Sequence, residues 1–160
     1  MNLPDLNSLS QSEFAHRLGW IFEDSPWVAE RAWTHRPFAS IDALHAAMAA
    51  EVERATQDEQ LALLRAHPDL GARARMSAAS VSEQSGAGLD QLAAEDYEEL
   101  TRLNQTYRET FGFPFLFAVK GSTRHDILKA LRRRVAATRE EEFRTALDQV
   151  FRIARFRLEG

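Results

Sequence analysis

The chain of 160 residues contains no cysteine. This absence excludes a disulfide framework, a thiolate metal site and a cysteine nucleophile. No apolar run approaches the roughly 20 residues that a helix needs to cross a bilayer, and the polar first residues, with an acid at Asp5, are unlike a secretory signal. We therefore expect a cytoplasmic protein that has no membrane partner.

Several catalytic motifs are also absent. The five histidines are scattered, without the H-x-x-x-H spacing of a zinc site, so no metal is expected. The sequence has no G-x-G-x-x-G or P-loop for a phosphate-bearing cofactor and no G-x-S-x-G nucleophile elbow. Its formal net charge is 20 − 24 = −4, which does not favour nucleic acid as a partner. The basic run 124–139 is interpreted as the solvated face of a helix.

The residues that are present describe a soluble globular protein. Hydrophobic residues make up 44% of the chain and charged residues 28%. A length of 160 residues suits one domain, spanning 1–160, whose core needs no metal or disulfide. Apolar residues recur at helical spacing through most of the chain. We predict an all-α fold, a single-domain compact bundle of about seven or eight helices without significant sheet.

Polar residues that cap helices mark where these helices begin. The predicted starts are Ser8 or Ser10, Ser40, Thr56 with Glu59, Thr123, and Thr138 with Glu141. A long helix is expected to close at Phe111 and Gly112. The run from Phe113 to Val119 is almost wholly apolar, but no second strand exists to pair with it. We expect this run to be a buried, irregular segment.

The helical pattern breaks twice between residues 65 and 89. The first helix must stop near His67, because Pro68 disfavours helical dihedral angles in the residue before it. The dipole at a helix C-terminus favours a protonated imidazole, so His67 is either a simple cap of the helix end or a candidate for acid–base catalysis. Residues 72–79 are predicted to form a loop.

A short helical piece is expected to follow, beginning at Ser80 or Ser82 and carrying Glu83 and Gln84 near its start. A carboxylate at that place interacts favourably with the helix dipole. Glu83 and Gln84 are also suited to bind a polar, planar ligand through hydrogen bonds. Ser80 either caps the helix, which its spacing from Glu83 favours, or contacts the same ligand.

Taken in series, the motifs of this chain resemble the family of OHCU decarboxylase (2-oxo-4-hydroxy-4-carboxy-5-ureidoimidazoline decarboxylase), an enzyme of urate degradation. The resemblance runs from about Phe14 to Leu158. The residues that carry it are Arg36-Pro37-Phe38, His67-Pro68-Asp69-Leu70-Gly71, Ser80-Val81-Ser82-Glu83-Gln84, Ala87-Gly88-Leu89, Leu103-Asn104 with Tyr107, Phe111-Gly112-Phe113-Pro114-Phe115, and Ile153-Ala154-Arg155-Phe156-Arg157-Leu158. Each motif alone is weak, but their order along the chain is specific.

This resemblance implies an all-helical, homodimeric enzyme that needs no cofactor and forms (S)-allantoin and carbon dioxide. It implies that His67 is the acid–base group, linked to Glu83. Substrate-binding positions carried over from the family are Pro68, Ser80, Gln84, Phe115, Leu116, Phe117, Ala118, Val119 and Arg157. Arg155 is the alternative to Arg157, because residues two apart on a helix point about 200° away from each other.

Two expectations remain to be tested. If the assignment is right, the side chains of His67 and Glu83 should lie within about 3–5 Å of each other. The rival interpretation is a non-catalytic helical binding module, a protein-interaction partner within purine catabolism. The two interpretations differ in whether the folded protein turns over the substrate.

Overall fold

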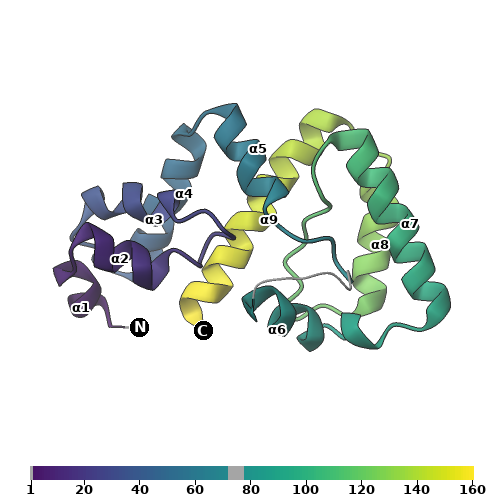
Figure 1. The fold of residues 1–160 in the computed structure, drawn as a ribbon, viewed down its shortest axis with the longest axis horizontal. Coiled ribbons are helices and arrows are strands. Elements are labelled where there is room, and N and C mark those ends of the chain that lie inside the picture. The colour runs from purple at the N-terminus through teal and green to yellow at the C-terminus, as the bar shows by residue number, and fades with distance from the viewer. Residues whose placement is uncertain (1, 72–77) are drawn as a thin grey trace. The chain divides into compact units, whose positions relative to one another are not determined.

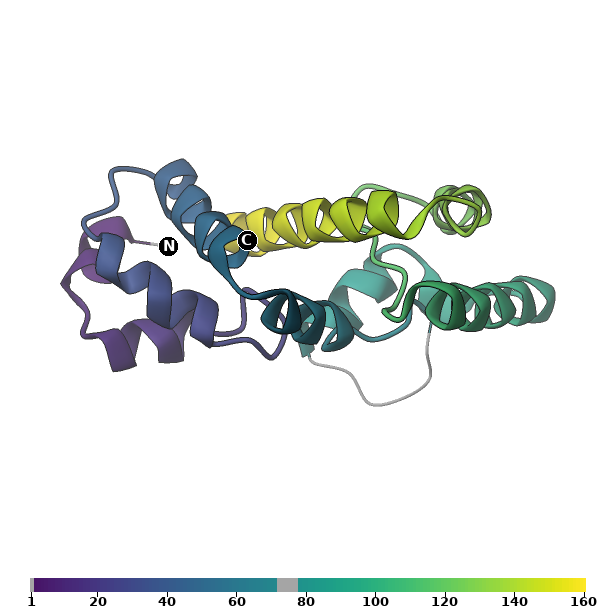
Figure 2. The ribbon, with the colours of Figure 1, turned by 90° about the horizontal axis from the view of Figure 1, so that it is seen from above.

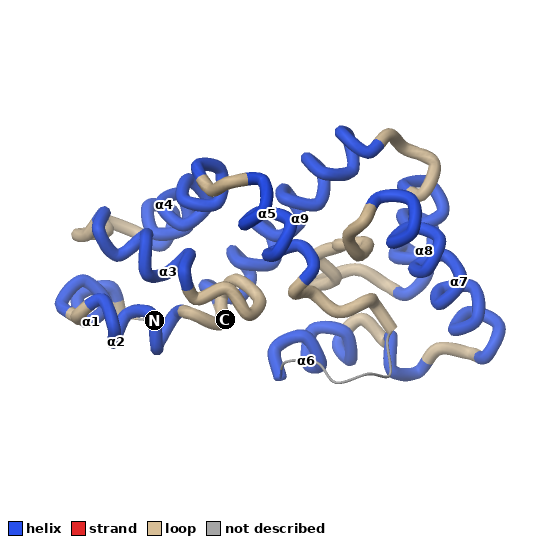
Figure 3. The backbone as a smooth tube through the Cα atoms, turned by 45° about the horizontal axis from the view of Figure 1, so that its top comes forward, coloured by secondary structure: helices blue, strands red, loops and turns tan. Residues whose placement is uncertain are grey.

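The computed structural model describes residues 2–71 and 78–160. Within these residues it contains nine α-helices and two short 3-10 helices, with no strand (Figure 3). The predicted all-α class is confirmed, although the helices exceed the expected seven or eight. Among the described helices, none is both long enough and apolar enough to cross a membrane.

The chain divides into two compact units, Met1–Ala66 with Phe151–Gly160, and His67–Val150. The first unit contains α1 (Leu3–Ser8), α2 (Gln11–Leu18), α3 (Trp27–Ala32), η1 (Trp33–His35), α4 (Ile41–Arg54) and α5 (Gln57–Arg65). The second contains α6 (Ala78–Gly86), η2 (Leu89–Gln91), α7 (Ala94–Phe111) and α8 (Arg124–Arg134). The last helix, α9 (Arg139–Glu159), contributes its first part to the second unit and its last part to the first.

In the first unit, α3 packs against both α2 and α4 (Figures 1 and 2). The side chains that fill this unit come from apolar positions at helical spacing, such as Phe14 of α2 and Leu44 and Met48 of α4, and all three are fully buried. Trp33 adds a hydrogen bond to this packing, since its indole N–H donates to the carbonyl of Leu9 at 2.9 Å. The core of this unit therefore follows from the amphipathic pattern of the sequence.

The predicted capping residues do begin the helices. The side chains of Ser10, Ser40, Thr56 and Thr123 each accept a hydrogen bond from the backbone N–H three residues later, and Thr138 does the same for Glu141. The prediction missed α1, where the Asn2 side chain accepts from the N–H of Asp5 and a proline stands in the first turn. Both are recognised helix-start signals.

In the second unit, α7 ends as predicted. Gly112 follows Phe111 with a φ of 83°, a left-handed conformation that glycine adopts without strain. The chain between α7 and α8 then runs as loop (Figure 3), yet Phe113 and Phe115 within it are fully buried. The prediction of a buried irregular segment is confirmed.

Glu59 is expected to make stability depend on acid pH. Its carboxylate pairs with Arg31 and accepts from the N–H of Thr56, and these contacts lower the pKa of Glu59 from 4.5 to about 2. The ionised form is thus favoured in the folded state. The contribution of Glu59 to the free energy of unfolding is therefore fully present above pH 4.5 and is lost as the pH falls towards 2.

In urea unfolding, Glu59→Gln should be less stable than wild type at pH 7, and the difference in free energy of unfolding should shrink by pH 3. Glu98→Gln, at an exposed position of α7, is the control. A difference that stays constant with pH would contradict this account.

Candidate active site

His67 lies directly after the end of a helix. The last helical residue of α5 is Arg65, and the N–H of Ala66 closes the final turn on the carbonyl of Ala62 at 3.0 Å. The predicted stop before Pro68 is therefore confirmed. His67 is only 6% exposed, so its imidazole belongs to the interior of the protein.

The second predicted break differs from the expectation. Helix α6 already includes Ala78 and Ala79, so the expected start at Ser80 or Ser82 is wrong. Alanine has the highest helix propensity, which accounts for the earlier start. Ser80 is consequently inside the helix and is no N-cap. The rest of the predicted loop, residues 72–77, lies outside the described residues.

Glu83 and Gln84 therefore occupy the C-terminal half of α6. The favourable dipole interaction expected for Glu83 at a helix start does not apply there. Ser80, Glu83 and Gln84 are spaced i, i+3 and i+4, which places them on one face of the helix. Ser80 and Gln84 are buried and Glu83 is half-buried. One partly accessible carboxylate thus lies beside two buried polar side chains.

Gln84 connects this face to the loop that follows His67. Its amide oxygen Oε1 accepts from the backbone N–H of Gly71 at 2.8 Å. The two breaks in the helical pattern, 13 residues apart in sequence, therefore meet in space. The close approach of the His67 and Glu83 side chains stays a prediction.

The segment from Phe115 to Val119 forms an apolar wall. Its side chains are buried except that of Phe117, which is half-buried and stacks on Phe115 with the ring centroids 6.0 Å apart. Three of its main-chain groups are bound by protein. The Leu116 carbonyl accepts from Arg134, the Ala118 N–H donates to Gln149, and the Val119 carbonyl accepts from Ser122.

A buried polar network from three helices holds this wall. Arg134 of α8 donates through Nη1 to the Leu116 carbonyl at 2.6 Å and through Nε to the Glu142 carboxylate of α9 at 2.8 Å. Its guanidinium carbon lies 4.5 Å from the centroid of the Phe115 ring. The Tyr107 hydroxyl of α7 donates to the same Glu142 oxygen at 2.5 Å. Burial, helped by this bond, raises the pKa of Tyr107.

The sequence did not single out this network. The basic run 124–139 was expected to be a solvated face, but Arg134 is only 7% exposed. Arg132 and Arg133, beside it, are exposed as predicted. The available signal was helical spacing. Arg134 lies three residues after the buried Leu131, which itself lies four residues after the buried Ile127, so all three share one face of the helix.

Arg157 lies in the first unit, also buried. Its Nη2 pairs with the Glu23 carboxylate at 2.8 Å, and its Nη1 donates to the Trp20 carbonyl at 3.0 Å. Arg155 instead bonds to Asp42 and Glu159 on a more exposed side of α9. The opposite directions of the two arginines agree with the helical geometry. The assignment of Arg157 to a ligand stays a prediction.

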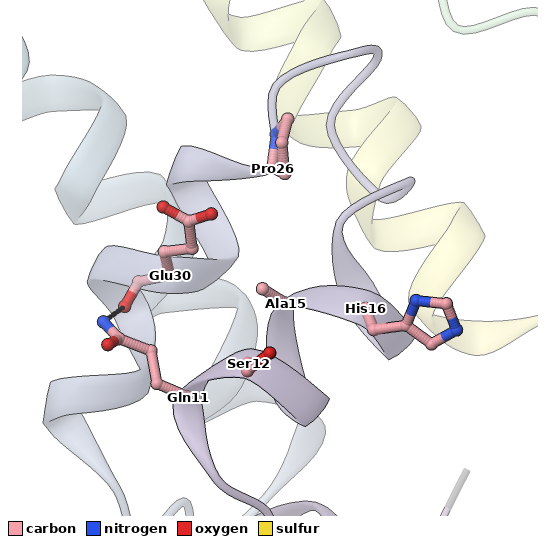
Figure 4. A pocket seen from close by; sticks show the side chains of 6 residues that line it. All are labelled: Gln11, Ser12, Ala15, His16, Pro26 and Glu30. Atoms are coloured by element: carbon pink, nitrogen blue, oxygen red, sulfur yellow. Dashed lines mark hydrogen bonds between the residues drawn. The ribbon is translucent and has the colours of Figure 1, made fainter.

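A surface hollow of about 470 Å³ in the first unit contains none of the predicted site residues. Its lining residues are Gln11, Ser12, Ala15, His16, Pro26 and Glu30. In Figure 4 the Gln11 amide bonds to the Glu30 backbone, while the His16 ring points away from the Glu30 side chain. Across the described ranges 2–71 and 78–160, no three acidic or histidine side chains are grouped so as to hold a metal ion.

Comparison with known proteins identifies the family. The profile of OHCU decarboxylase matches residues 7–159. The chain belongs to the OHCU decarboxylase family. It is 51% identical over 158 residues to 2-oxo-4-hydroxy-4-carboxy-5-ureidoimidazoline decarboxylase of Haloferax volcanii, covering 99% of this chain and 94% of that protein.

Two further relatives are longer than this chain. A uric acid degradation bifunctional protein of Bacillus subtilis is 47% identical over 156 residues, which cover 98% of this chain and 32% of that protein. The crystal structure of an (S)-allantoin synthase superposes with a TM-score of 0.82 at 37% identity, covering 99% of this chain and 53% of that chain. The helical fold described above is therefore also that of a solved structure.

Gly71 gives a test of how tightly the His67 loop is packed in this OHCU decarboxylase family member. Its φ is +74°, and an added Cβ would lie 2.4 Å from Cδ2 of the buried Leu100. Gly88 has a similar φ of +79° but no neighbour within 4 Å of such a Cβ. Left-handed backbone costs alanine roughly 1–2 kcal/mol, so Gly88→Ala should lose about that much free energy of unfolding and Gly71→Ala more.

A double-mutant cycle checks that the excess comes from Leu100. In a Leu100→Ala background the contact is gone, so the costs of Gly71→Ala and Gly88→Ala should become similar in urea unfolding. Equal costs in the wild-type background would show that the loop yields freely to the added methyl group.

Proposed function

We propose that this protein decarboxylates 2-oxo-4-hydroxy-4-carboxy-5-ureidoimidazoline to (S)-allantoin and carbon dioxide in urate degradation. The observation that carries the proposal is the hydrogen bond from Gly71 to Gln84. It joins the loop of His67 to the helix face of Ser80, Glu83 and Gln84, the residues that the resemblance assigns to catalysis and substrate binding. Membership of the family supports the same reaction.

The substrate can supply its own electron acceptor. The bond between the ring carbon and its carboxylate breaks, and the electron pair enters the adjacent ring C=N as carbon dioxide leaves. The imine nitrogen gains a proton, the ring hydroxyl loses one as it becomes a carbonyl, and the ureido-bearing carbon gains one. One proton is taken up for each carbon dioxide released, so no external electron sink is needed.

The polar groups of the second unit are assigned to these proton transfers and to orienting the substrate. His67 moves protons, and Glu83, which retains access to solvent, is linked to it. Gln84 and Ser80 bind polar edges of the substrate, Pro68 lines the site, and the main chain of Phe115 to Val119 forms a wall that excludes water. Adding the final proton from one face gives a single enantiomer of allantoin.

Three further features are part of the proposal and come from the resemblance. Arg157 is assigned to a substrate oxygen, with Arg155 as the alternative. The enzyme is proposed to function as a cytoplasmic homodimer, in which residues 1–160 act as one domain. It is proposed to need no cofactor.

The test is a coupled assay on freshly generated substrate. Urate is oxidised to the unstable intermediate, the protein is added, and the circular dichroism of allantoin is followed. Wild-type protein should accelerate formation of (S)-allantoin. His67→Ala should lower the rate about 10²–10⁴-fold, the usual effect of removing an acid–base group, whereas His125→Ala, at an exposed position of α8, should retain it.

Two outcomes would count against the proposal. If racemic allantoin forms at the uncatalysed rate in the presence of folded wild-type protein, the protein is a non-catalytic binding module. Accelerated, stereospecific turnover by His67→Ala would keep the activity but reject His67 as the acid–base group.

A further inference from the structure

Three neighbouring residues of the His67 loop are each held by a side chain from elsewhere in the second unit. The Asp69 carboxylate accepts from Arg108 at 2.8 Å, the Leu70 carbonyl from Asn104 at 2.9 Å, and the Gly71 N–H donates to Gln84 at 2.8 Å. The loop is therefore bound through the side chain of Asp69, the carbonyl of Leu70 and the N–H of Gly71.

One stripe of α7 supplies most of this support. Leu100, Asn104 and Arg108 are spaced at i, i+4 and i+8, so they follow one another along one face of the helix. Cδ2 of Leu100 lies where a Cβ of Gly71 would meet it, Asn104 binds Leu70 and Arg108 binds Asp69. The loop thus runs antiparallel to the stripe, with one contact for each turn of the helix.

Asn104 is the central and most enclosed of the polar contacts. Its side chain is 4% exposed, whereas the pair of Arg108 and Asp69 is partly open to solvent. A carbonyl oxygen can only accept, so the amide of Asn104 must present Nδ2 to Leu70. Within the described part of the chain, Oδ1 of Asn104 has no hydrogen-bond partner. The polar role of this buried side chain is therefore its bond to the loop.

We propose that Asn104 is a positioning residue that fixes the His67 loop for the decarboxylation assigned above, and the proposal rests on that function. Asn104 acts through Leu70, three residues beyond His67, and is not assigned a contact with the substrate. A side chain of this kind should affect the chemical step more than substrate binding, because a displacement of about 1 Å at a reacting group can cost 10²-fold in rate.

Asn104→Leu keeps the size of the side chain and removes the donor to Leu70. Its kcat should fall about 10- to 100-fold, while KM changes less than about threefold, since substrate contacts remain. The imidazole signals of His67 in a ¹H–¹³C spectrum, assigned by their loss in His67→Gln, should shift or broaden. This spectroscopic readout reports on the loop without turnover.

The matched control is Asn7→Leu in the first unit. The Asn7 amide also donates to a backbone carbonyl, that of Phe38 at 3.0 Å. The two variants are assayed at temperatures equally far below their own unfolding temperatures. Under these conditions Asn7→Leu should retain kcat and leave the His67 signals unmoved. If Asn104→Leu does not fold, Asn104→Ala takes its place, because alanine also lacks the donor and adds no bulk.

Wild-type kcat together with unchanged His67 signals in the folded Asn104 variant would overturn the inference. An equal fall in kcat for Asn7→Leu would also overturn it, because the effect would then be general destabilisation. If wild-type protein has no decarboxylase activity, the proposed function fails, and the His67 signals alone decide whether Asn104 positions the loop.

Discussion

The second unit depends on the buried ion pair between Arg134 and Glu142. Both side chains are more than nine-tenths removed from solvent, so each charge needs the other. Loss of one partner from such a pair typically costs about 3–5 kcal/mol, because the remaining charge stays buried. The pair also ties α8 to the first part of α9. Through Nη1 of Arg134 it holds the Leu116 carbonyl in a segment that has no helical hydrogen bonds of its own.

Helix α7 connects this network to the His67 loop. Tyr107 reaches Glu142, while Asn104, one turn earlier, reaches Leu70. Two irregular segments that are more than 40 residues apart in sequence are thereby bound to the same rigid element. The two segments, proposed to bind the substrate and to move its protons, can be held in register in this way without lying in a helix or a sheet themselves.

The sequence predicted features that local interactions determine. Ser40 and Thr56 were recognised because a cap acts on backbone within three residues, and Pro68 because it restricts the residue before it. The start of α6 was missed, because Ser80 stands three residues before Glu83 and so fits the spacing of a cap. The buried state of Arg134 depends on Glu142 and Leu116, which only the fold brings near. His67, Glu83 and Gln84 were candidates because they stand at breaks in the helical pattern. The family resemblance added the other proposed site residues, and spacing alone left a cap as the favoured role for Ser80.

The buried hydroxyl of Tyr107 keeps its bond to Glu142 under alkaline conditions. Burial raises the pKa of Tyr107 above its ordinary value of 10, so the hydroxyl remains a donor to Glu142 where an exposed tyrosine would ionise. A phenolate beside that carboxylate would repel it and loosen the hold on Leu116. Because the proton is retained, the bond from Tyr107 to Glu142 persists on the alkaline side.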